Sequence, residues 1–397
     1  MKENNIKPCF SLKELCEELS ISHSTGKNWI KLGKISPDIN DNMFSEEYLY
    51  NLKNNILQNK NTLKNRRNKN FISGNQLYEY YLENKTQNAQ NIENLLSYIE
   101  NNKIPVTEDL ICNQILDCAT QFLKSRDLSC SELIKDIKNL TKSQNKINLH
   151  QKYKYIAGED TLGLLYISLK SISKRKSLGA YYTPTKIVKK LCHPLFDKQD
   201  LKNKSVYDPC CGTGNFLINL PDDFNIENIY GTDIDLMSVL ITRINLALKY
   251  KIKDVECLYN NIKVQNYLEQ KSDKKYDYIL GNPPWGYNFS DLEKKLLKTK
   301  FKSAKGTSVE SYDVILEKAL SDLSHKGILS FLLPEAILNV KSHTNIRNFI
   351  LENFSITYVE YLGEVFQKVQ CPCVILQITN NKFSTYGINI IDKDNKY

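Results

Sequence analysis

One short segment limits the folds open to this chain more than any other. An apolar run, residues 276–281, leads directly into Asn282-Pro283-Pro284-Trp285. Proline fixes its own φ and has no backbone N–H, so two successive prolines end the strand and make the turn rigid. The segment therefore predicts a β-strand that ends in a fixed turn, where the Asn282 side chain and the Pro283 carbonyl are available as acceptors.

The residues of this turn suit the methylation of a planar amino group. An exocyclic amine is a poor nucleophile because its lone pair is delocalised into the ring. The Asn282 oxygen and the Pro283 carbonyl can each accept one N–H of that amine and draw its nitrogen toward a tetrahedral geometry. Trp285 offers a flat face for a base taken out of its stack. The alternative is an ordinary strand-ending turn, since Asn and Pro are common in turns.

A second segment upstream, residues 205–216, reads as a short strand, a glycine-containing turn and the start of a helix. Gly212 and Gly214 permit positive φ and let a ligand approach the backbone closely. Asp208 ends the strand and Cys210 lies inside the turn. The spacing is neither the dinucleotide G-x-G-x-x-G pattern nor a P-loop, which needs Gly-Lys-Ser/Thr, so ATP is not the expected ligand.

Two acids follow the next strand, residues 228–231, in the sequence Thr232-Asp233-Ile234-Asp235. An acid at this place, roughly 20 residues beyond a glycine turn, can bind ribose hydroxyls. Alternatively, both acids lie at a helix N-terminus, where the helix dipole favours negative charge. We expect Asp233 to bind the ribose, with Ile234 in the same cofactor site, and Asp235 to cap the helix.

With these motifs in this order, the chain resembles the gamma class of S-adenosylmethionine-dependent N6-adenine DNA methyltransferases. It is similar to the methylase parts of type I and type IIG restriction–modification enzymes, from residue 157 to about residue 380. The resemblance implies S-adenosyl-L-methionine as the cofactor and a flipped adenine of double-stranded DNA as the substrate. The catalytic residues that it implies are Asn282, Pro283, Pro284 and Trp285.

A further segment of the family pattern is Gly-Ala-Tyr-Tyr-Thr-Pro at 179–184. In the family this segment covers the methionine end of the cofactor, which implies contacts from Tyr182, Thr183 and Pro184. The family usually has an acid after the third strand that binds the adenine amino group of the cofactor. This chain offers Asn261 there, whose amide oxygen can still accept that hydrogen bond.

Residues 362–369 resemble the family segment whose aromatic side chain packs on the flipped base. Phe366 is the candidate for that role, and a core phenylalanine between the last two strands is the alternative. The resemblance and the motifs together implicate this set in cofactor binding: Tyr182, Thr183, Pro184, Asp208, Cys210, Gly212, Gly214, Asp233, Ile234 and Asn261.

Composition agrees with an anionic partner without identifying it. The net charge is +9 and the pI is about 8.8, and basic residues gather at 60–69, 170–176 and 294–305. The last cluster follows the Asn-Pro-Pro-Trp turn, where phosphate contacts would position a duplex, although a charge run is often only a solvated face.

The 11 cysteines and 5 histidines show no metal-ligand spacing, so we expect no metal site. Without a signal peptide or a long apolar run, a cytoplasmic protein with no membrane contact is expected.

Three domains are expected: a helix-turn-helix module at 1–55, a helical spacer at 56–156 and the methyltransferase domain at 157–397. In the first, Ser11 and Glu14 have the spacing of a capping box and Phe10 can pack on Leu15. The module resembles the helix-turn-helix of the MerR and excisionase type, though two short helices also serve as protein–protein modules. If it binds DNA, the outward side chains of its second helix are His23, Ser24, Lys27, Asn28 and Lys31.

The expected fold class is α/β, a doubly wound, seven-stranded, mostly parallel sheet with an all-α N-terminal region. Strands are expected near 205–208, 228–231, 255–258, 276–281, 327–333, 355–362 and 372–379. Methylation of an RNA base or of a protein glutamine uses a similar Asn-Pro-Pro-aromatic motif and stays open, as does a non-catalytic DNA-binding subunit. A separate specificity or restriction subunit is a possible partner, and the target DNA sequence is not encoded in any recognisable motif.

Overall fold

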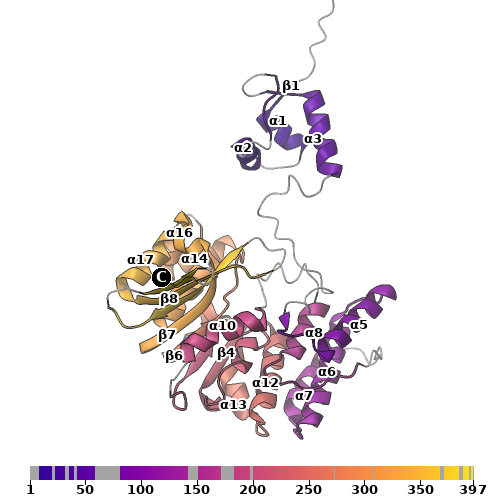
Figure 1. Cartoon of the computed structure of the whole chain (residues 1–397), viewed down its shortest axis with the longest axis vertical. Coiled ribbons are helices and arrows are strands. Elements are labelled where there is room, and N and C mark those ends of the chain that lie inside the picture. Colours follow the sequence, from indigo (N-terminus) through magenta and orange to yellow (C-terminus); the bar gives the residue numbers. More distant parts are fainter. Residues whose placement is uncertain are drawn as a thin grey trace, which may run out of the picture. The chain divides into compact units, whose positions relative to one another are not determined.

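The computed structural model describes residues 9–19, 23–31, 35–39, 43–58, 81–141, 151–170, 183–196, 200–271, 273–306, 308–366, 371–383, 388–392 and 395–396. The chain forms two compact units, Met1–Asn70 and Phe71–Tyr397 (Figure 1). Several expected features lie outside the described residues: the basic cluster at 60–69, Lys174–Lys176, Tyr182, and the segment 367–369 after Phe366.

The first unit is a small helical module with a two-stranded antiparallel sheet. Its core is formed by Leu15, Trp29, Phe44 and their neighbours. The expected capping box is present, because the Ser11 hydroxyl accepts from the Glu14 N–H and the Glu14 carboxylate accepts from the Ser11 N–H at 2.8 Å. The elements are β1 (Cys9–Ser11), α1 (Leu12–Glu18), α2 (His23–Lys31), β2 (Met43–Ser45) and α3 (Glu46–Gln58).

The second unit begins with a helical layer that shares one continuous apolar core with the sheet. The helices are α5 (Gln87–Asn101), α6 (Glu108–Ser125), α7 (Ser131–Leu140), α8 (Thr161–Leu169) and α10 (Thr185–Phe196). A buried carboxylate joins this layer to the glycine turn. Asp160 is 0% exposed and accepts from Tyr81 Oη at 2.6 Å, Thr213 Oγ1 at 2.5 Å and Asn245 Nδ2 at 2.7 Å.

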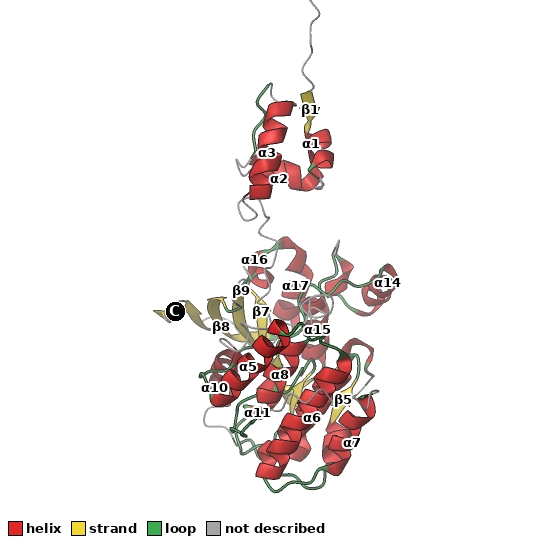
Figure 2. Cartoon of the chain, turned by 90° about the vertical axis from the view of Figure 1, so that its right-hand side faces the viewer, coloured by secondary structure: helices red, strands yellow, loops and turns green. Residues whose placement is uncertain are grey.

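The sheet of the second unit has nine strands among the described residues, in the order β11-β10-β8-β9-β7-β6-β3-β4-β5. The strands are β3 (Val206–Asp208), β4 (Ile229–Asp233), β5 (Ile262–Val264), β6 (Tyr276–Gly281), β7 (Leu323–Pro334), β8 (Ser355–Glu364), β9 (Pro372–Thr379), β10 (Asn389–Asp392) and β11 (Asn395–Lys396). Of the strands in the described ranges, only β9 and β11 run antiparallel to their neighbours. The α/β fold with a mostly parallel sheet is therefore as expected. Figure 2 shows the strands in yellow and the surrounding helices in red.

The helices after the glycine turn are α11 (Asn215–Ile218), α12 (Leu236–Tyr250), α13 (Glu256–Asn261), α14 (Asp291–Lys300), α15 (Ser311–Ser321), α16 (Ala336–Asn339) and α17 (Thr344–Asn353). Short 3₁₀ turns lie among these helices and the strands: η1 (Ile226–Asn228), η2 (Tyr267–Glu269), η3 (Ser303–Lys305) and η4 (Lys341–His343).

The strand expected at 255–258 is wrong. These residues belong mostly to α13, and the third strand is β5, at Ile262–Val264. The Asp254 side chain accepts the Glu256 N–H at 3.0 Å, and such a local side-chain hydrogen bond favours a turn or a helix start over a strand. The sheet also gains β10 and β11 beyond the seven strands expected.

The order of the central strands locates the ligand site. From β3 the chain adds β4 and β5 on one side of the sheet, whereas β6 pairs with the other side of β3 and β7 follows it. Right-handed crossovers put the helices of these two halves on opposite faces. The strand order therefore reverses between β3 and β6, and ligands of such sheets bind at the C-terminal strand ends beside this reversal.

Candidate functional site

A cavity lies at the C-terminal ends of β3, β4, β5 and β6. It is lined by Lys170, Pro209, Cys210, Gly212, Asp233, Ile234, Asp235, Gln265, Asn266, Tyr267, Leu268, Asn282, Pro284, Tyr287, Phe289, Glu293, Ser311 and Ile315. The cavity thus brings together parts of both motifs found in the sequence, the glycine turn and the Asn-Pro-Pro-Trp turn. Carboxylates occupy one part of its wall, and aromatic and aliphatic side chains occupy another.

The glycine turn after β3 contributes Cys210 and Gly212 to the wall. Gly212 has φ +52° and donates its N–H to Asp233 Oδ2 at 2.9 Å. Gly214 lies behind the wall, with φ +87°, and a Cβ there would approach Thr242 Cγ2 to 2.9 Å. Both glycines are therefore required by backbone conformation or by close packing.

The two acids at the end of β4, Asp233 and Asp235, differ in their surroundings. Asp233 accepts from Gly212 and from the Asp235 N–H at 2.9 Å, and burial raises its pKa to about 6. Burial also acts on Asp235, but Lys170 and other donors hold the pKa of that carboxylate below its usual value. Lys170 Nζ lies 2.8 Å from Asp235 Oδ2, with the side chain of Lys170 only 10% exposed.

Asp235 stands at the N-cap position of α12, as expected, but its carboxylate makes no hydrogen bond to the helix backbone. It accepts instead from Lys170, from Tyr166 Oη at 2.6 Å and from Ser238 Oγ at 2.8 Å. Two of the three partners of Asp235 therefore come from α8 and from Lys170, the C-cap residue of that helix. Through Lys170, the helical layer contributes to the cavity wall.

Asp208 is one residue that the structure places behind the cavity. It is 1% exposed, and its Oδ1 accepts the Cys210 N–H at 3.1 Å. Burial and the neighbouring Asp233 raise its pKa to about 8. A Cβ at Gly281, which has φ +145°, would come within 2.6 Å of Asp208 Oδ1. Asp208 therefore packs against Gly281 at the end of β6, next to the Asn-Pro-Pro-Trp turn.

The Asn-Pro-Pro-Trp turn is held by two hydroxyl groups. Asn282 Nδ2 donates to Thr183 Oγ1 at 3.1 Å, and Ser311 Oγ donates to the Pro284 carbonyl at 2.5 Å. Asn282 and Pro284 line the cavity, whereas Pro283 is buried next to it.

Trp285 and Phe366 contact each other. Their ring centroids are 5.3 Å apart at an interplanar angle of 82°, and the two residues are 2% and 8% exposed. Neither lines the cavity, so Trp285 does not present an open face in this structure. A contact of either ring with a flipped base stays a prediction.

Asn261 does not follow the third strand, because that strand begins after it. It ends α13 and donates its amide to the Glu227 carbonyl at 2.9 Å, outside the cavity wall. The residues that do follow the strand and line the cavity are Gln265 and Asn266. The prediction that Asn261 follows the third strand is therefore wrong, because Asn261 ends the helix that precedes this strand.

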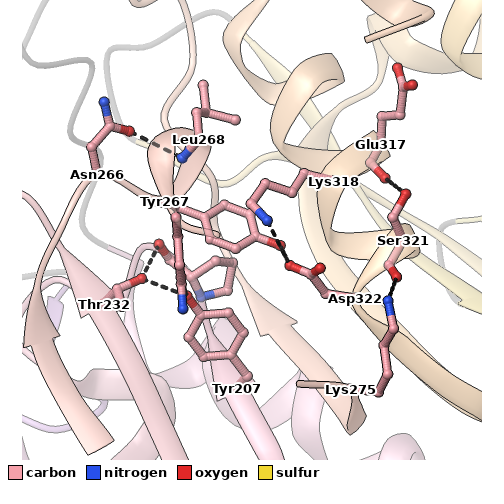
Figure 3. A network of polar contacts seen from close by, with 12 residues as sticks. Tyr207, Thr232, Asn266, Tyr267, Leu268, Lys275, Glu317, Lys318, Ser321 and Asp322 are labelled. Carbon is pink, nitrogen blue, oxygen red and sulfur yellow. Dashed lines mark hydrogen bonds and ion pairs between the residues drawn. The ribbon is translucent and has the colours of Figure 1, made fainter. Parts of the chain in front are cut away.

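The wall after β5 is held by a network of polar contacts, shown in Figure 3. Tyr267 Oη donates to Asp322 Oδ2 at 2.7 Å, and Lys318 lies 3.1 Å from the same carboxylate. Asn266 Oδ1 accepts the Leu268 N–H at 3.1 Å and so shapes the turn. These contacts fix the loop that carries Gln265 to Leu268 against α15.

Comparison with known proteins decides the family. The model of the family described as N-6 DNA Methylase matches residues 158–397, a range that contains every residue lining the cavity. The chain belongs to the N-6 DNA methylase family.

Two curated proteins illustrate the similarity. The type II methyltransferase M.VspI of Vibrio sp. (strain 343) is 31% identical over 208 residues, 51% of this chain and 48% of that protein. M.HincII of Haemophilus influenzae is 29% identical over 231 residues, 56% of this chain and 41% of that protein. The chain thus spans about half, or less, of the length of these relatives.

A solved structure supports the fold. A Listeria monocytogenes protein, described as a class I S-adenosylmethionine-dependent methyltransferase, superposes with a TM-score of 0.51 at 18% identity, over 77% of this chain and 94% of that one. No helix among the described ranges is both long and apolar enough to cross a bilayer.

Several residues of this N-6 DNA methylase site gave no usable signal in the sequence. Ser311 lies far along the chain from the turn that it contacts, and Tyr287 and Phe289 follow the motif without a pattern of their own. Lys170 lay within a basic cluster, but its burial beside Asp235 was not expected. Of the segment at 179–184, Thr183 and Pro184 are described and lie outside the cavity wall.

Proposed function

We propose that this chain transfers a methyl group from S-adenosyl-L-methionine to the exocyclic N6 of adenine in double-stranded DNA, as a gamma-class enzyme of a restriction–modification system. The observation that carries the proposal is that one cavity is lined both by Asp233, the candidate ribose acid, and by Asn282, the candidate acceptor for the amine. Family membership over residues 158–397 supports the same reading.

The chemistry of the cavity wall fits this cofactor. The carboxylates of Asp233 and Asp235 suit hydroxyl groups of a ribose, because each ionised oxygen accepts hydrogen bonds. Ile234, Leu268 and Phe289 are apolar neighbours that suit a purine ring. Gly212, without a side chain, lets a ligand approach the main chain of the turn.

When bound, S-adenosylmethionine supplies an electrophilic methyl carbon. In our account Asn282 Oδ1 and the Pro283 carbonyl each accept one N–H of the adenine amine, which localises its electron pair on nitrogen. That pair would form the new N–C bond to the methyl carbon as the C–S bond pair leaves on sulfur, which becomes a neutral thioether, and one N–H proton of the methylated amine would pass to water. The chain needs to orient the reactants and accept hydrogen bonds, and it needs no nucleophile of its own.

Cysteine chemistry is not part of the proposal. Burial raises the pKa values of the Cys210 and Cys211 thiols well above their usual range, so both are protonated at neutral pH. Thiols in this state are poor nucleophiles. Both also belong to the cofactor turn, so the attack on a cytosine ring that carbon-5 methylation requires is disfavoured.

Duplex DNA is proposed to contact α14 and the turn that follows it. This helix comes directly after the Asn-Pro-Pro-Trp turn, and Glu293 on it lines the cavity. Its exposed basic residues are suited to phosphate contacts, which position a duplex without reading its sequence. The basic residues of this region are Lys294, Lys295, Lys298, Lys300, Lys302 and Lys305.

We propose the domains expected from the sequence: a MerR/excisionase-like helix-turn-helix at 1–55, a helical spacer at 56–156 and the catalytic domain at 157–397. The exposed side chains of His23 and Lys27 on α2 support a DNA-facing role for that helix. The shared core of α5–α7 with the sheet suggests that the spacer folds with the catalytic domain. A separate specificity or restriction subunit is the proposed partner for site recognition.

The proposal is tested by single-molecule sequencing of DNA from cells that produce the chain alone, with Asn282→Ala as the matched control. We expect N6-methyladenine at a defined set of sites in cells with the wild-type chain, and none above background with the variant. If a partner supplies recognition, the pattern appears only when that partner is co-expressed. Methylation that persists in Asn282→Ala cells would contradict the assigned role of this turn.

A further inference from the structure

The Asn282 side chain is tied to a residue 99 positions earlier in the chain. Its Nδ2 donates to Thr183 Oγ1 at 3.1 Å. Thr183 is 5% exposed and does not line the cavity. A primary amide has its donor and its acceptor on opposite sides of one carbon, so fixing the nitrogen also fixes the direction of the oxygen.

Thr183 is itself held in place from behind. Asn215 Nδ2, on the first residue of α11, donates to the Thr183 carbonyl at 2.8 Å. Asn215 Oδ1 in turn receives a hydrogen bond from Asn219 Nδ2 at 3.1 Å, and Thr185 Oγ1 lies 3.4 Å away. Asn215 and Thr185 are 6% and 3% exposed. Thr183 is thus clamped between the helix after the glycine turn and the catalytic turn.

We propose that Thr183 is a positioning residue for Asn282: its hydroxyl accepts the amide nitrogen and so turns Asn282 Oδ1 toward the amine of the target base. This inference rests on the proposed function, and it replaces the contact with the methionine end of the cofactor that the family resemblance implies for Thr183. Without the hydroxyl, the amide can rotate and present its NH₂ to the amine, where two donors face each other.

The test compares Thr183→Val, which keeps the size and removes the hydroxyl, with Thr183→Ser, which restores it. Thr379→Val is the matched control, because it removes a buried threonine hydroxyl that hydrogen-bonds the Gly327 carbonyl at 3.1 Å, and Thr379 does not line the cavity. Two quantities are measured for each variant: the single-turnover rate of methyl transfer to duplex DNA, and the Kd for S-adenosylmethionine by calorimetry. Thermal unfolding shows whether each variant is folded.

We expect Thr183→Val to lower the transfer rate about 10- to 100-fold, the size of effect that misplacement of a reacting group can have. Its Kd for the cofactor should stay within about twofold, and Thr183→Ser should recover most of the rate. Thr379→Val should leave the rate near that of the wild type. In an Asn282→Ala background, Thr183→Val should have no further effect on any residual rate, since the two residues act as one unit.

A rise in Kd with an unchanged single-turnover rate would overturn the inference and make Thr183 a cofactor-binding residue. An unchanged rate and an unchanged Kd in folded Thr183→Val would also overturn it. These failures differ from a failure of the proposed function, which would appear as a wild-type chain that methylates no adenine. In that case both the proposed function and the positioning role of Thr183 would be contradicted.

Discussion

The hydroxyl group of Ser311 donates a 2.5 Å hydrogen bond to the main-chain carbonyl of Pro284. Ser311 is the first residue of α15, it is 1% exposed, and its Oγ also accepts the Tyr287 N–H at 3.4 Å. The second carbonyl of the Pro-Pro turn is therefore already engaged, and in the proposed function the Pro283 carbonyl is the backbone acceptor for the substrate amine. The start of α15 is in turn held by Asp313, whose carboxylate lies 2.8 Å from His343 Nδ1.

We expect Ser311→Ala to lower the rate of methyl transfer about tenfold while cofactor affinity changes little, because the turn loses one of its two anchors. Loss of a buried hydrogen bond should also reduce the free energy of unfolding by about 1–3 kcal/mol. Ser303→Ala is the matched control, since Ser303 is buried and its hydroxyl has no hydrogen-bond partner among the described residues. Equal rate losses in both variants would show that the Ser311 contact has no special role.

Cofactor affinity should depend on pH through Asp233. Burial raises the pKa of this carboxyl to about 6, so it is ionised above pH 6 and becomes a weaker acceptor for ribose hydroxyls as the pH falls through 6. We expect the Kd for S-adenosylmethionine, measured by calorimetry from pH 5 to 8, to rise below pH 6 by up to about tenfold per unit, the limit for one required ionisation. Asp233→Asn should weaken binding at pH 8 and flatten the profile.

Lys170 offers a sharper form of the same test. Its positive charge lowers the pKa of Asp233. Lys170→Met should therefore raise that pKa and move the rise in Kd to a higher pH. At still higher pH, where Asp233 is ionised in the variant too, the Kd of the variant should return part of the way to the wild-type value. Lys189→Met is a suitable control, because Lys189 pairs with Glu83 and is half exposed away from the cavity wall. A Lys170→Met profile identical to that of the wild type would contradict the electrostatic role of Lys170.

The packing between the helical layer and the glycine turn should tolerate no added methyl group at Gly163 without a loss of stability. A Cβ at Gly163 would lie 1.9 Å from Asp160 Oδ2 and 2.4 Å from Thr213 Oγ1. Gly163→Ala should therefore lower the free energy of unfolding by about 1–3 kcal/mol, as overpacked cores do, and urea denaturation measures it. Gly306→Ala is the control, because the nearest atoms to a Cβ there are 3.6 Å away. Equal stability of the two variants would contradict the packing described.

DNA binding should be dominated by phosphate contacts of α14. The affinity of the chain for duplex DNA should fall with salt, with a log–log slope of about −0.9 for each phosphate neutralised. Replacing Lys298 and Lys300 by alanine should reduce the magnitude of that slope by about 2, or about 1 for each contact. The same change at Lys135 and Lys138, which are exposed on α7, should leave the slope unchanged. Equal effects of the two pairs would argue against α14 as the DNA-facing helix.

The features predicted correctly from sequence are those that neighbouring residues determine. The capping box at Ser11, the positive-φ glycines of the turn and the strand that ends at Gly281 all depend on local residue types. The prediction of the third strand failed because a segment as short as 255–258, in which three of the four residues are apolar, does not distinguish a strand from a helical turn. For the same reason, Asn261 was expected to follow the third strand, whereas it precedes that strand in the structure.

The contacts that organise the site could not be predicted in this way. Thr183 meets Asn282, and Ser311 meets Pro284, only because the sheet order places distant segments together. Lys170 joins Asp235 through a helix that precedes the sheet in the chain. The burial of Trp285 against Phe366 likewise follows from packing, whereas the motif suggested an open aromatic face.

The central claim is most directly tested by the identity of the methylated product. The purified chain, with its partner subunit if one is required, is incubated with methyl-labelled S-adenosylmethionine and with duplex DNA, RNA or protein in separate reactions. Each product is then digested and separated by liquid chromatography with mass detection. The account predicts label in N6-methyladenine from duplex DNA, lost in Asn282→Ala. Label that appears only in an RNA base or in a glutamine side chain, or in DNA as a methylated cytosine, would contradict it.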